Sequence, residues 1–251
     1  SVGKTTLALD FARHAALAGF KVGVFSLEMS KDQLVDRMLA AHAHVDLWRL
    51  RTGKLSTGGN DDDFLRLGDA ISELSQATLY IDDNPSANIM GMRTMARRLQ
   101  TEHGLDLLII DYLQLMESSR YTDNRVQEVS AISRGLKKLA IELQVPVMAL
   151  SQLSRAVEMR TDQRPKLSDL RESGSIEQDA DVVMFLHRQT WEGEERPEIM
   201  EVDLLIEKHR NGPTGEIPLQ FNTQNVSYSE TEQFHIEPAN LAGAPVQHTA
   251  A

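Results

Sequence analysis

Ser1-Val2-Gly3-Lys4-Thr5-Thr6 begins the chain and matches the second half of a phosphate-binding loop, G-x-x-x-x-G-K-[ST]. In such a loop the glycine lets the backbone approach phosphate oxygens, the lysine meets the β and γ phosphates, and the next hydroxyl binds Mg²⁺. A helix starting here points its N-terminal amides at the same anion. We therefore predict that Ser1, Gly3, Lys4, Thr5 and Thr6 bind ATP, and that Thr5 also binds Mg²⁺. The match is short, so the nucleotide-site prediction holds only if the other motifs of such an ATPase follow in order along the chain.

Amphipathic helices alternate with apolar strands along most of the sequence. We expect helices over residues 4–18, 30–42, 60–75, 89–103 and 126–143, and strands over 21–27, 78–82, 105–111 and 145–150. Closing strands are expected over 182–186, 201–206, 217–221 and 226–228, and a long polar loop over 152–174. The alternation predicts an α/β fold with a mainly parallel, twisted sheet, helices on both of its faces, and a C-terminal β-hairpin region.

Composition limits the classes of protein that fit this chain. Its 251 residues, 41% hydrophobic and 25% charged, suit one soluble α/β domain, which we expect over residues 1–235. Residues 236–251 have the small and polar composition of a disordered tail. The chain has no cysteine and no apolar run long enough to span a membrane, which favours a cytoplasmic protein. A net charge of −11 argues against a broadly basic surface that coats nucleic acid.

Three polar residues follow apolar strands, where the carboxyl ends of a parallel sheet form ligand sites. Asp111, after Leu107-Leu-Ile-Ile, is predicted to bind Mg²⁺, although an aspartate that ends a strand is common. Glu28 is predicted to deprotonate the attacking water; the alternative is a carboxylate that merely favours a helix start. Gln152 can hydrogen-bond the γ-phosphate or the water, unless it is simply a polar strand end.

Six motifs in order give the chain a family resemblance. They are G-K-T-T at 3–6, F-S-L-E-M at 25–29, L-L-I-I-D-Y-L-Q-L-M at 107–116, L-S-Q-L-S-R at 150–155, D-L-R-E-S-G-S-I-E-Q-D-A-D at 169–181 and K-H-R-N-G-P-T-G at 208–215. This set resembles the C-terminal motor domain of bacterial DnaB-type replicative DNA helicases. The last two motifs distinguish that family from RecA-like recombinases and circadian ATPases, which share only the core.

The resemblance implies a RecA-like fold, a homo-hexamer that binds ATP between neighbours, and single-stranded DNA in its centre. Arg171, Glu172 and Gly174 fall where the family contacts the DNA backbone; a helix-capping loop with solvated charges is the alternative. Lys208 and Arg210 match the basic pair that reaches the neighbour's ATP, unless they form a solvated hairpin tip. A primase and a helicase loader are the expected partners of the full-length family.

Four features of the family pattern are missing from this sequence, and two other functions stay open. The leading glycine of the loop, its preceding strand, the N-terminal domain and the linker helix are not in this sequence. Ser1 suits the residue that must follow a protein-splicing intein, so an intein junction is one hypothesis for this start; a truncated gene model is another. The open alternatives are a RecA-like recombination or repair ATPase that forms filaments on single-stranded DNA, and an inactive helicase fragment.

Overall fold

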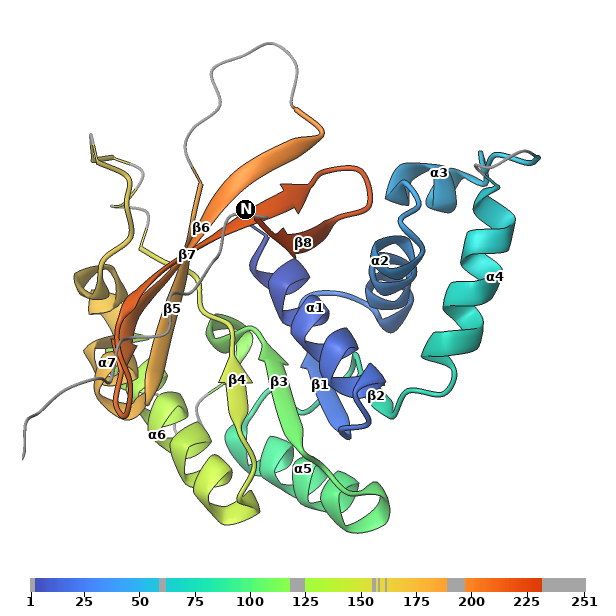
Figure 1. Ribbon diagram of the computed structural model, residues 1–251. Coiled ribbons are helices and arrows are strands. Elements are labelled where there is room, and N and C mark those ends of the chain that lie inside the picture. The colour runs from blue at the N-terminus through green and yellow to red at the C-terminus, as the bar shows by residue number, and fades with distance from the viewer. Residues whose placement is uncertain are drawn as a thin grey trace, which may run out of the picture.

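The computed structural model describes residues 3–58, 62–117, 125–154, 157, 159–160, 162–188 and 197–231; side chains of 125 and 171–174 are not described. Its first half alternates helices and strands (Figure 1): α1 Lys4–Leu17, β1 Val22–Ser26, α2 Lys31–Ala43, α3 Leu47–Thr52, α4 Asp63–Leu74, β2 Leu79–Asp82, α5 Ile89–His103 and β3 Leu107–Asp111. There follow η1 Leu113–Leu115, α6 Arg125–Leu143, β4 Val147–Ala149, η3 Leu167–Ser173, α7 Gly174–Asp179, β5 Val182–His187, β6 Ile199–His209, β7 Gly215–Asn222 and β8 Ser227–Glu230.

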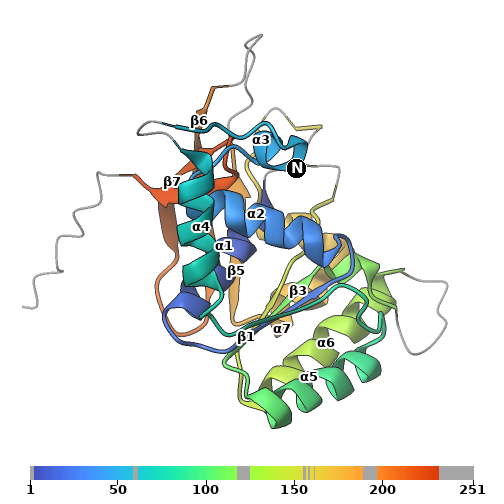
Figure 2. The same ribbon diagram turned by 90° about the vertical axis from the view of Figure 1, so that its right-hand side faces the viewer.

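A parallel sheet in the order β2-β1-β3-β4 forms the centre of the domain. Helices α1 and α2 cover one face, and α5 and α6 cover the other, as Figure 2 shows. Neighbouring residues of β3 point to opposite faces, so Ile109 packs with α1 and α2 while Leu108 and Ile110 pack with α5 and α6. This arrangement confirms the predicted α/β fold with a helix-covered parallel sheet.

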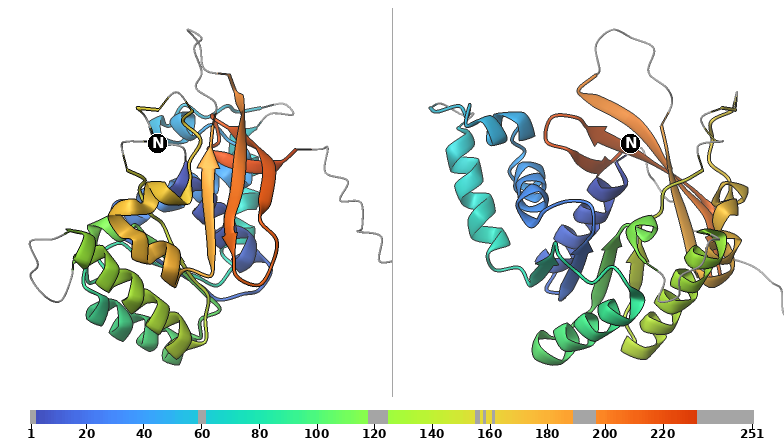
Figure 3. Two further views of the ribbon diagram at one scale, coloured as in Figure 1. Left: turned by 90° about the vertical axis from the view of Figure 1, so that its left-hand side faces the viewer. Right: turned by 180° about the vertical axis from the view of Figure 1, so that it is seen from behind.

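The C-terminal strands form a second, antiparallel sheet in the order β5-β6-β7-β8. In Figure 3 its orange and red strands stand next to the gold helix α7. Leu170 of η3 and Phe185 of β5 belong to the hydrophobic cluster on that side. On the other side Leu7 of α1 packs against a cluster that includes Tyr228. The hairpin region expected at this end is therefore a complete sheet attached to α1 and α7.

The expected loop over 152–174 is partly wrong, because η3 occupies residues 167–173. Leu167 and Leu170 place their side chains against the antiparallel sheet, which stabilises a short helix without a long periodic pattern. Helix α3 was also not predicted, although Asp46 caps it by accepting a hydrogen bond from the Arg49 amide at 2.7 Å. Its six residues are too few for a clear helical period.

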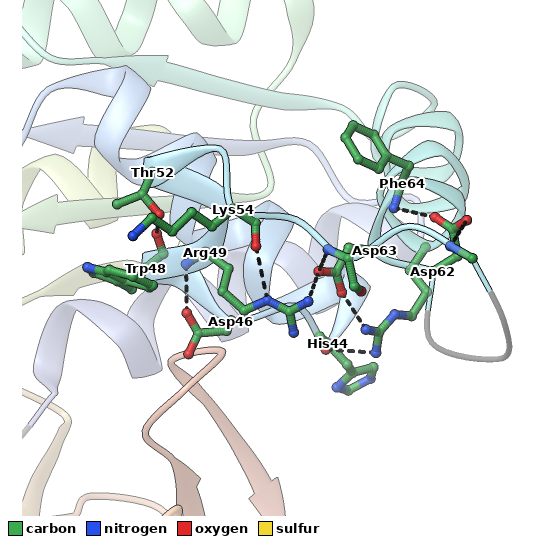
Figure 4. Close-up of polar contacts among 12 residues, drawn as sticks. His44, Asp46, Trp48, Arg49, Thr52, Lys54, Asp62, Asp63 and Phe64 are labelled. Carbon is green, nitrogen blue, oxygen red and sulfur yellow. Dashed lines mark hydrogen bonds and ion pairs between the residues drawn. The ribbon is translucent and has the colours of Figure 1, made fainter.

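Helices α2, α3 and α4 form an arm at one end of the domain (Figure 1). Figure 4 shows the polar cluster that joins α3 to α4 around Asp63, whose side chain is fully buried. Its carboxylate pairs with Arg49 at 2.5 Å and Arg66 at 2.6 Å, and accepts a hydrogen bond from the Ser56 amide at 2.8 Å. A buried carboxylate with charged and amide partners on several sides fixes the connection between the two helices.

The expected tail over 236–251 lies outside the described residues, so the domain boundary near residue 235 stays a prediction. In the described part of the chain, none of the helices has the length and apolar character needed to cross a membrane.

Candidate nucleotide site

The site begins at Gly3, the residue that precedes α1. Its φ of +92° lies in the left-handed region, which glycine adopts without the strain that a side chain brings. A Cβ atom at this position would lie 2.6 Å from the Tyr228 hydroxyl oxygen. The glycine therefore lets the chain turn into α1 close to β8. Ser1, which we also predicted to bind ATP, lies outside the described residues.

Lys4 extends from the first turn of α1 to the end of β4. Its Nζ donates a hydrogen bond to the Ser151 carbonyl at 2.9 Å and lies 5.6 Å from the centre of the Tyr112 ring. Burial lowers the pKa of Lys4, while the negative charges of Asp111 and Glu28 act in the opposite direction. A half-buried ammonium between two carboxylates is well placed to meet a polyphosphate.

Thr5 and Asp111, which are both predicted to bind Mg²⁺, are in direct contact. The Thr5 hydroxyl donates a hydrogen bond to Oδ2 of Asp111 at 2.7 Å, although the two residues are 106 positions apart. Burial raises the pKa of Asp111; the hydrogen bond from Thr5 and the charge of Lys4 oppose this shift, and Glu28 adds to it.

These two groups fit a magnesium ion. A hydroxyl and one carboxylate at the carboxyl end of a strand are oxygen ligands of the kind that Mg²⁺ takes, with phosphate and water oxygens completing its shell. Within the described ranges, three or more His, Cys, Asp or Glu side chains do not cluster into an all-protein metal site. The geometry therefore suits a metal that is shared with a bound nucleotide.

Glu28 lies two residues beyond β1, in a short turn built by Ser26. The fully buried Ser26 hydroxyl donates to the Met29 carbonyl at 2.7 Å and accepts from the Met29 amide at 3.1 Å. This turn leaves Glu28 exposed, and its charge acts on both Lys4 and Asp111. The strand ends thus bring Glu28 to the same site as the predicted phosphate and metal ligands.

Arg37 is a member of the site that we did not predict. Its Nη1 lies 3.5 Å from the Thr6 hydroxyl oxygen, with which it forms a weak hydrogen bond. Burial and the nearby Arg51 lower the pKa of Arg37, and the charges of Asp111 and Glu28 oppose them. The available signal was its place on α2, beside the inward-facing Leu34 and Met38, where a cation is unexpected.

Gln152 follows β4 and is exposed. Its backbone N–H donates a hydrogen bond to the side-chain Oε1 atom of Gln114 at 3.1 Å. The preceding Ser151 provides the carbonyl that holds Lys4. The structure therefore brings the predicted phosphate-sensing glutamine to the end of the sheet where Thr5 of α1 meets Asp111 of β3. The peptide bond between Asp111 and Tyr112 in the adjoining segment is cis.

Lys208 and Arg210 do not join this site within one chain. Lys208 donates hydrogen bonds to the carbonyls of Glu177 and Gln178, and Arg210 pairs with Asp181 at 3.3 Å. These contacts lie where β6 turns toward β7 beside α7, away from the start of α1 (Figure 1). The two basic residues would need a second copy of the chain to reach a nucleotide.

The segment predicted to contact DNA joins η3 to α7. Arg171 and Glu172 lie within η3, and Gly174 is the first residue of α7. The side chains of Arg171 and Glu172 lie outside the described residues, so the predicted role of this segment remains a prediction.

Comparison with known proteins identifies the family. The model of the DnaB-like helicase C-terminal domain matches residues 1–230. The chain is 51% identical over 223 residues to the replicative DNA helicase DnaB of Geobacillus stearothermophilus, covering 88% of this chain and 48% of that protein. It is 50% identical over 223 residues to the replicative DNA helicase DnaC of Bacillus subtilis strain 168, with the same coverage. The chain thus spans about half the length of these curated relatives.

Solved structures agree with this result. One that is described as an ATPase domain superposes with a TM-score of 0.84 at 37% identity, covering 92% of this chain and 82% of that one. A DnaB-like replicative helicase, described with its interactions with primase, superposes with a TM-score of 0.83 at 36% identity, covering 92% of this chain and 57% of that one. These neighbours confirm the RecA-like α/β fold that the sequence predicted.

Proposed function

The chain belongs to the family of DnaB-like helicase C-terminal domains, and from this membership we propose that it is the ATP-driven motor of a replicative DNA helicase. The observation that carries the proposal is the 2.7 Å hydrogen bond from Thr5 to Asp111. It joins two predicted Mg²⁺ ligands, from the start of α1 and the end of β3, beside the ammonium of Lys4. This arrangement supports the binding of Mg-ATP.

Each residue has a separate part in the hydrolysis of ATP. The amides at the start of α1 and the Lys4 ammonium bind the phosphates, and Thr5 and Asp111 hold Mg²⁺. Bound Mg²⁺ would neutralise charge on the phosphates. Glu28 accepts the proton of the attacking water, and Gln152 hydrogen-bonds that water or the γ-phosphate. Together these groups complete one half of the catalytic site.

The other half comes from a neighbouring copy of the chain. Lys208 and Arg210 reach the ATP of the adjacent subunit in a homo-hexamer, where a guanidinium stabilises the charge of the transition state. Arg171, Glu172 and Gly174 face the centre of the ring and bind the backbone of single-stranded DNA, which lets an acidic protein hold DNA through repeated local contacts. Primase and a helicase loader are partners of the full-length protein, which acts in the cytoplasm.

Replacement of the base tests the chemistry. In the full-length protein, Glu28→Gln should retain ATP binding and lose turnover by roughly 100-fold or more, in line with the usual contribution of a general base. Binding is measured with a fluorescent ATP analogue and turnover by phosphate release. Glu201→Gln is the matched control, because Glu201 is an exposed glutamate of β6 to which no part in the site is assigned. This variant should behave as the wild type. Normal hydrolysis by Glu28→Gln would refute the assignment of the base.

A mixing experiment tests the action of Arg210 on its neighbour. Arg210→Ala and Glu28→Gln rings should each be inactive. In rings formed from a 1:1 mixture, about a quarter of the boundaries should combine an intact Glu28 with an intact Arg210 from the next subunit. ATPase activity should therefore reappear on mixing. Mixed rings as inactive as their components would exclude action between subunits.

The two alternatives make different predictions. A recombination ATPase should form open filaments on single-stranded DNA and exchange strands, whereas a helicase should unwind duplex DNA with a single-stranded tail. An inactive fragment should fail to bind nucleotide. The family match and the arrangement of Lys4, Thr5 and Asp111 support the helicase.

A further inference from the structure

The carboxyl end of β4 continues beyond the backbone pairing of the parallel sheet. Ile110 and Ala149 are the last paired residues of β3 and β4. The Leu150 amide then donates to the Ile110 carbonyl at 2.9 Å, and the Leu113 amide donates to the Leu150 carbonyl at 2.9 Å. After Asp111 the segment that follows β3 turns into η1. Its backbone therefore no longer runs beside the residues that follow β4.

A side chain replaces the backbone at this point. The side-chain Oε1 of Gln114 in η1 accepts a hydrogen bond from the backbone amide of Gln152 at 3.1 Å. Its Nε2 donates to the backbone carbonyl of Gln152 at 3.0 Å. Nε2 also lies 2.9 Å from the Ser151 hydroxyl oxygen, to which it donates. The amide of Gln114 thus pairs with both backbone groups of Gln152, as a residue of a neighbouring strand would.

These partners leave one orientation for the Gln114 amide. A backbone N–H can only donate and a backbone carbonyl can only accept, so Oε1 must face the Gln152 nitrogen and Nε2 the Gln152 oxygen. Asparagine is the only other amide side chain with an acceptor and a donor on one planar group, and it is one methylene shorter. Glutamate keeps the shape but has no donor when it is ionised.

We infer that Gln114 is a positioning residue for ATP hydrolysis, which holds Gln152 and the Ser151 carbonyl in place relative to Asp111. The inference rests on the proposed role of Gln152 at the γ-phosphate. Gln114 follows Asp111 by three residues, so it joins the metal-binding end of β3 to the phosphate-sensing end of β4. The same pairing orients Ser151, whose carbonyl accepts the hydrogen bond from Lys4.

Two substitutions in the full-length protein test this role. Gln114→Ala removes the three contacts described above, and Gln114→Glu retains an acceptor for the Gln152 backbone amide while it repels the Gln152 carbonyl. Both should lower kcat roughly ten-fold or more, because half-buried Gln114 and Ser151 lose a hydrogen bond and the backbone of exposed Gln152 loses its fixed position in an organised site. The affinity for a fluorescent ATP analogue should change less than about three-fold, because the ligands of Mg-ATP stay intact.

Gln100→Ala is the matched control for a purely structural glutamine. Gln100 of α5 also donates from its side-chain amide to a backbone carbonyl, that of Leu143, at 2.7 Å. Its loss should lower the melting temperature by an amount similar to that of Gln114→Ala and leave kcat unchanged. If Gln114→Ala melts like Gln100→Ala and keeps the wild-type kcat, the positioning role is wrong.

A double-mutant cycle separates the inference from the proposed function on which it rests. If Gln114 acts through Gln152, the double variant Gln114→Ala/Gln152→Ala should have the kcat of Gln152→Ala alone. Additive losses would overturn the inference while leaving Gln152 as a functional residue. A wild-type kcat for Gln152→Ala would instead refute the proposed role of Gln152, and with it the coupling that we infer.

Discussion

Asp63 should be the residue on which the arm of α2, α3 and α4 depends most. We expect Asp63→Asn to destabilise the domain, because it removes the charge that two guanidinium groups share. Asparagine still accepts hydrogen bonds through its one side-chain oxygen, but its amide nitrogen must face a donor of Arg49, Arg66 or Ser56. One of these contacts therefore changes from attraction to repulsion.

The structure sets the size of this effect. Removal of one partner from a buried ion pair costs about 3–5 kcal/mol when the remaining charge stays buried. The side chains of Arg49 and Arg66 are 32% and 35% exposed, so water can solvate part of their released charge. We therefore expect a loss of about 2–3 kcal/mol in the free energy of unfolding, below the full range for a buried pair.

The effect should also depend on pH. Burial alone would raise the pKa of Asp63, but the hydrogen bonds from Ser56 and Arg66, together with the charge of Arg49, outweigh burial and lower it. A carboxylate whose pKa is lowered by folding stabilises the fold fully above its unfolded pKa, about 3.9. That stabilisation is lost as the pH falls through the folded pKa. The difference between wild type and Asp63→Asn should therefore shrink in acid.

Chemical denaturation at neutral pH measures the loss, and hydrogen exchange of the α4 amides locates it. Asp69→Asn is the matched control, since Asp69 is an exposed residue of the same helix, and it should change stability by less than about 0.5 kcal/mol. A loss for Asp63→Asn no larger than that of the control would refute the reasoning. So would unchanged protection of the amides of α4.

Two further predictions concern helix α1 and the residue that precedes it. Gly3→Ala should weaken ATP binding by roughly ten-fold, because a left-handed backbone costs a side-chain residue about 1 kcal/mol or more and its Cβ would lie 2.6 Å from the Tyr228 hydroxyl oxygen. Adding Tyr228→Phe should recover only the steric part in a nucleotide titration. Asp10→Ala should lower stability to denaturant by about 3 kcal/mol, because buried Asp10 pairs with buried Arg13 at 2.9 Å and accepts from the Tyr228 amide at 2.8 Å. Losses below about 1 kcal/mol would contradict this.

The parallel part of the fold could be predicted because its sequence signals are local. Each strand is a short apolar run, and each helix has an apolar face and a recognisable start, such as Ser30, which caps α2. From this order it follows that the ends of β1, β3 and β4 lie at one edge of the sheet. Glu28, Asp111 and Gln152 could therefore be assigned to one site before any contact was known.

The contacts that the sequence did not predict depend on tertiary packing. Gln114 meets Gln152 only because the chain after Asp111 turns into η1 instead of extending β3. Arg37 reaches Thr6 across the space between two helices. The place of Arg37 beside the inward-facing Leu34 and Met38 marks it as an unexpected cation but does not indicate Thr6 as its partner. Gln114 has no local pattern of this kind.

The positions of Lys208 and Arg210 in one chain are compatible with a role in the next. Arg210 is 52% exposed and its partner Asp181 49%, so their ion pair contributes at most about 1 kcal/mol. A guanidinium that meets a hydrolysing triphosphate accelerates the reaction by roughly 10³–10⁵-fold in other NTPases, a far larger free energy. The contact within the chain is therefore weak enough to be exchanged for a neighbour's nucleotide. If Lys208 acts in the next subunit as proposed, it would give up its hydrogen bonds to the Glu177 and Gln178 carbonyls of α7, the helix that begins at Gly174 of the segment predicted to bind DNA.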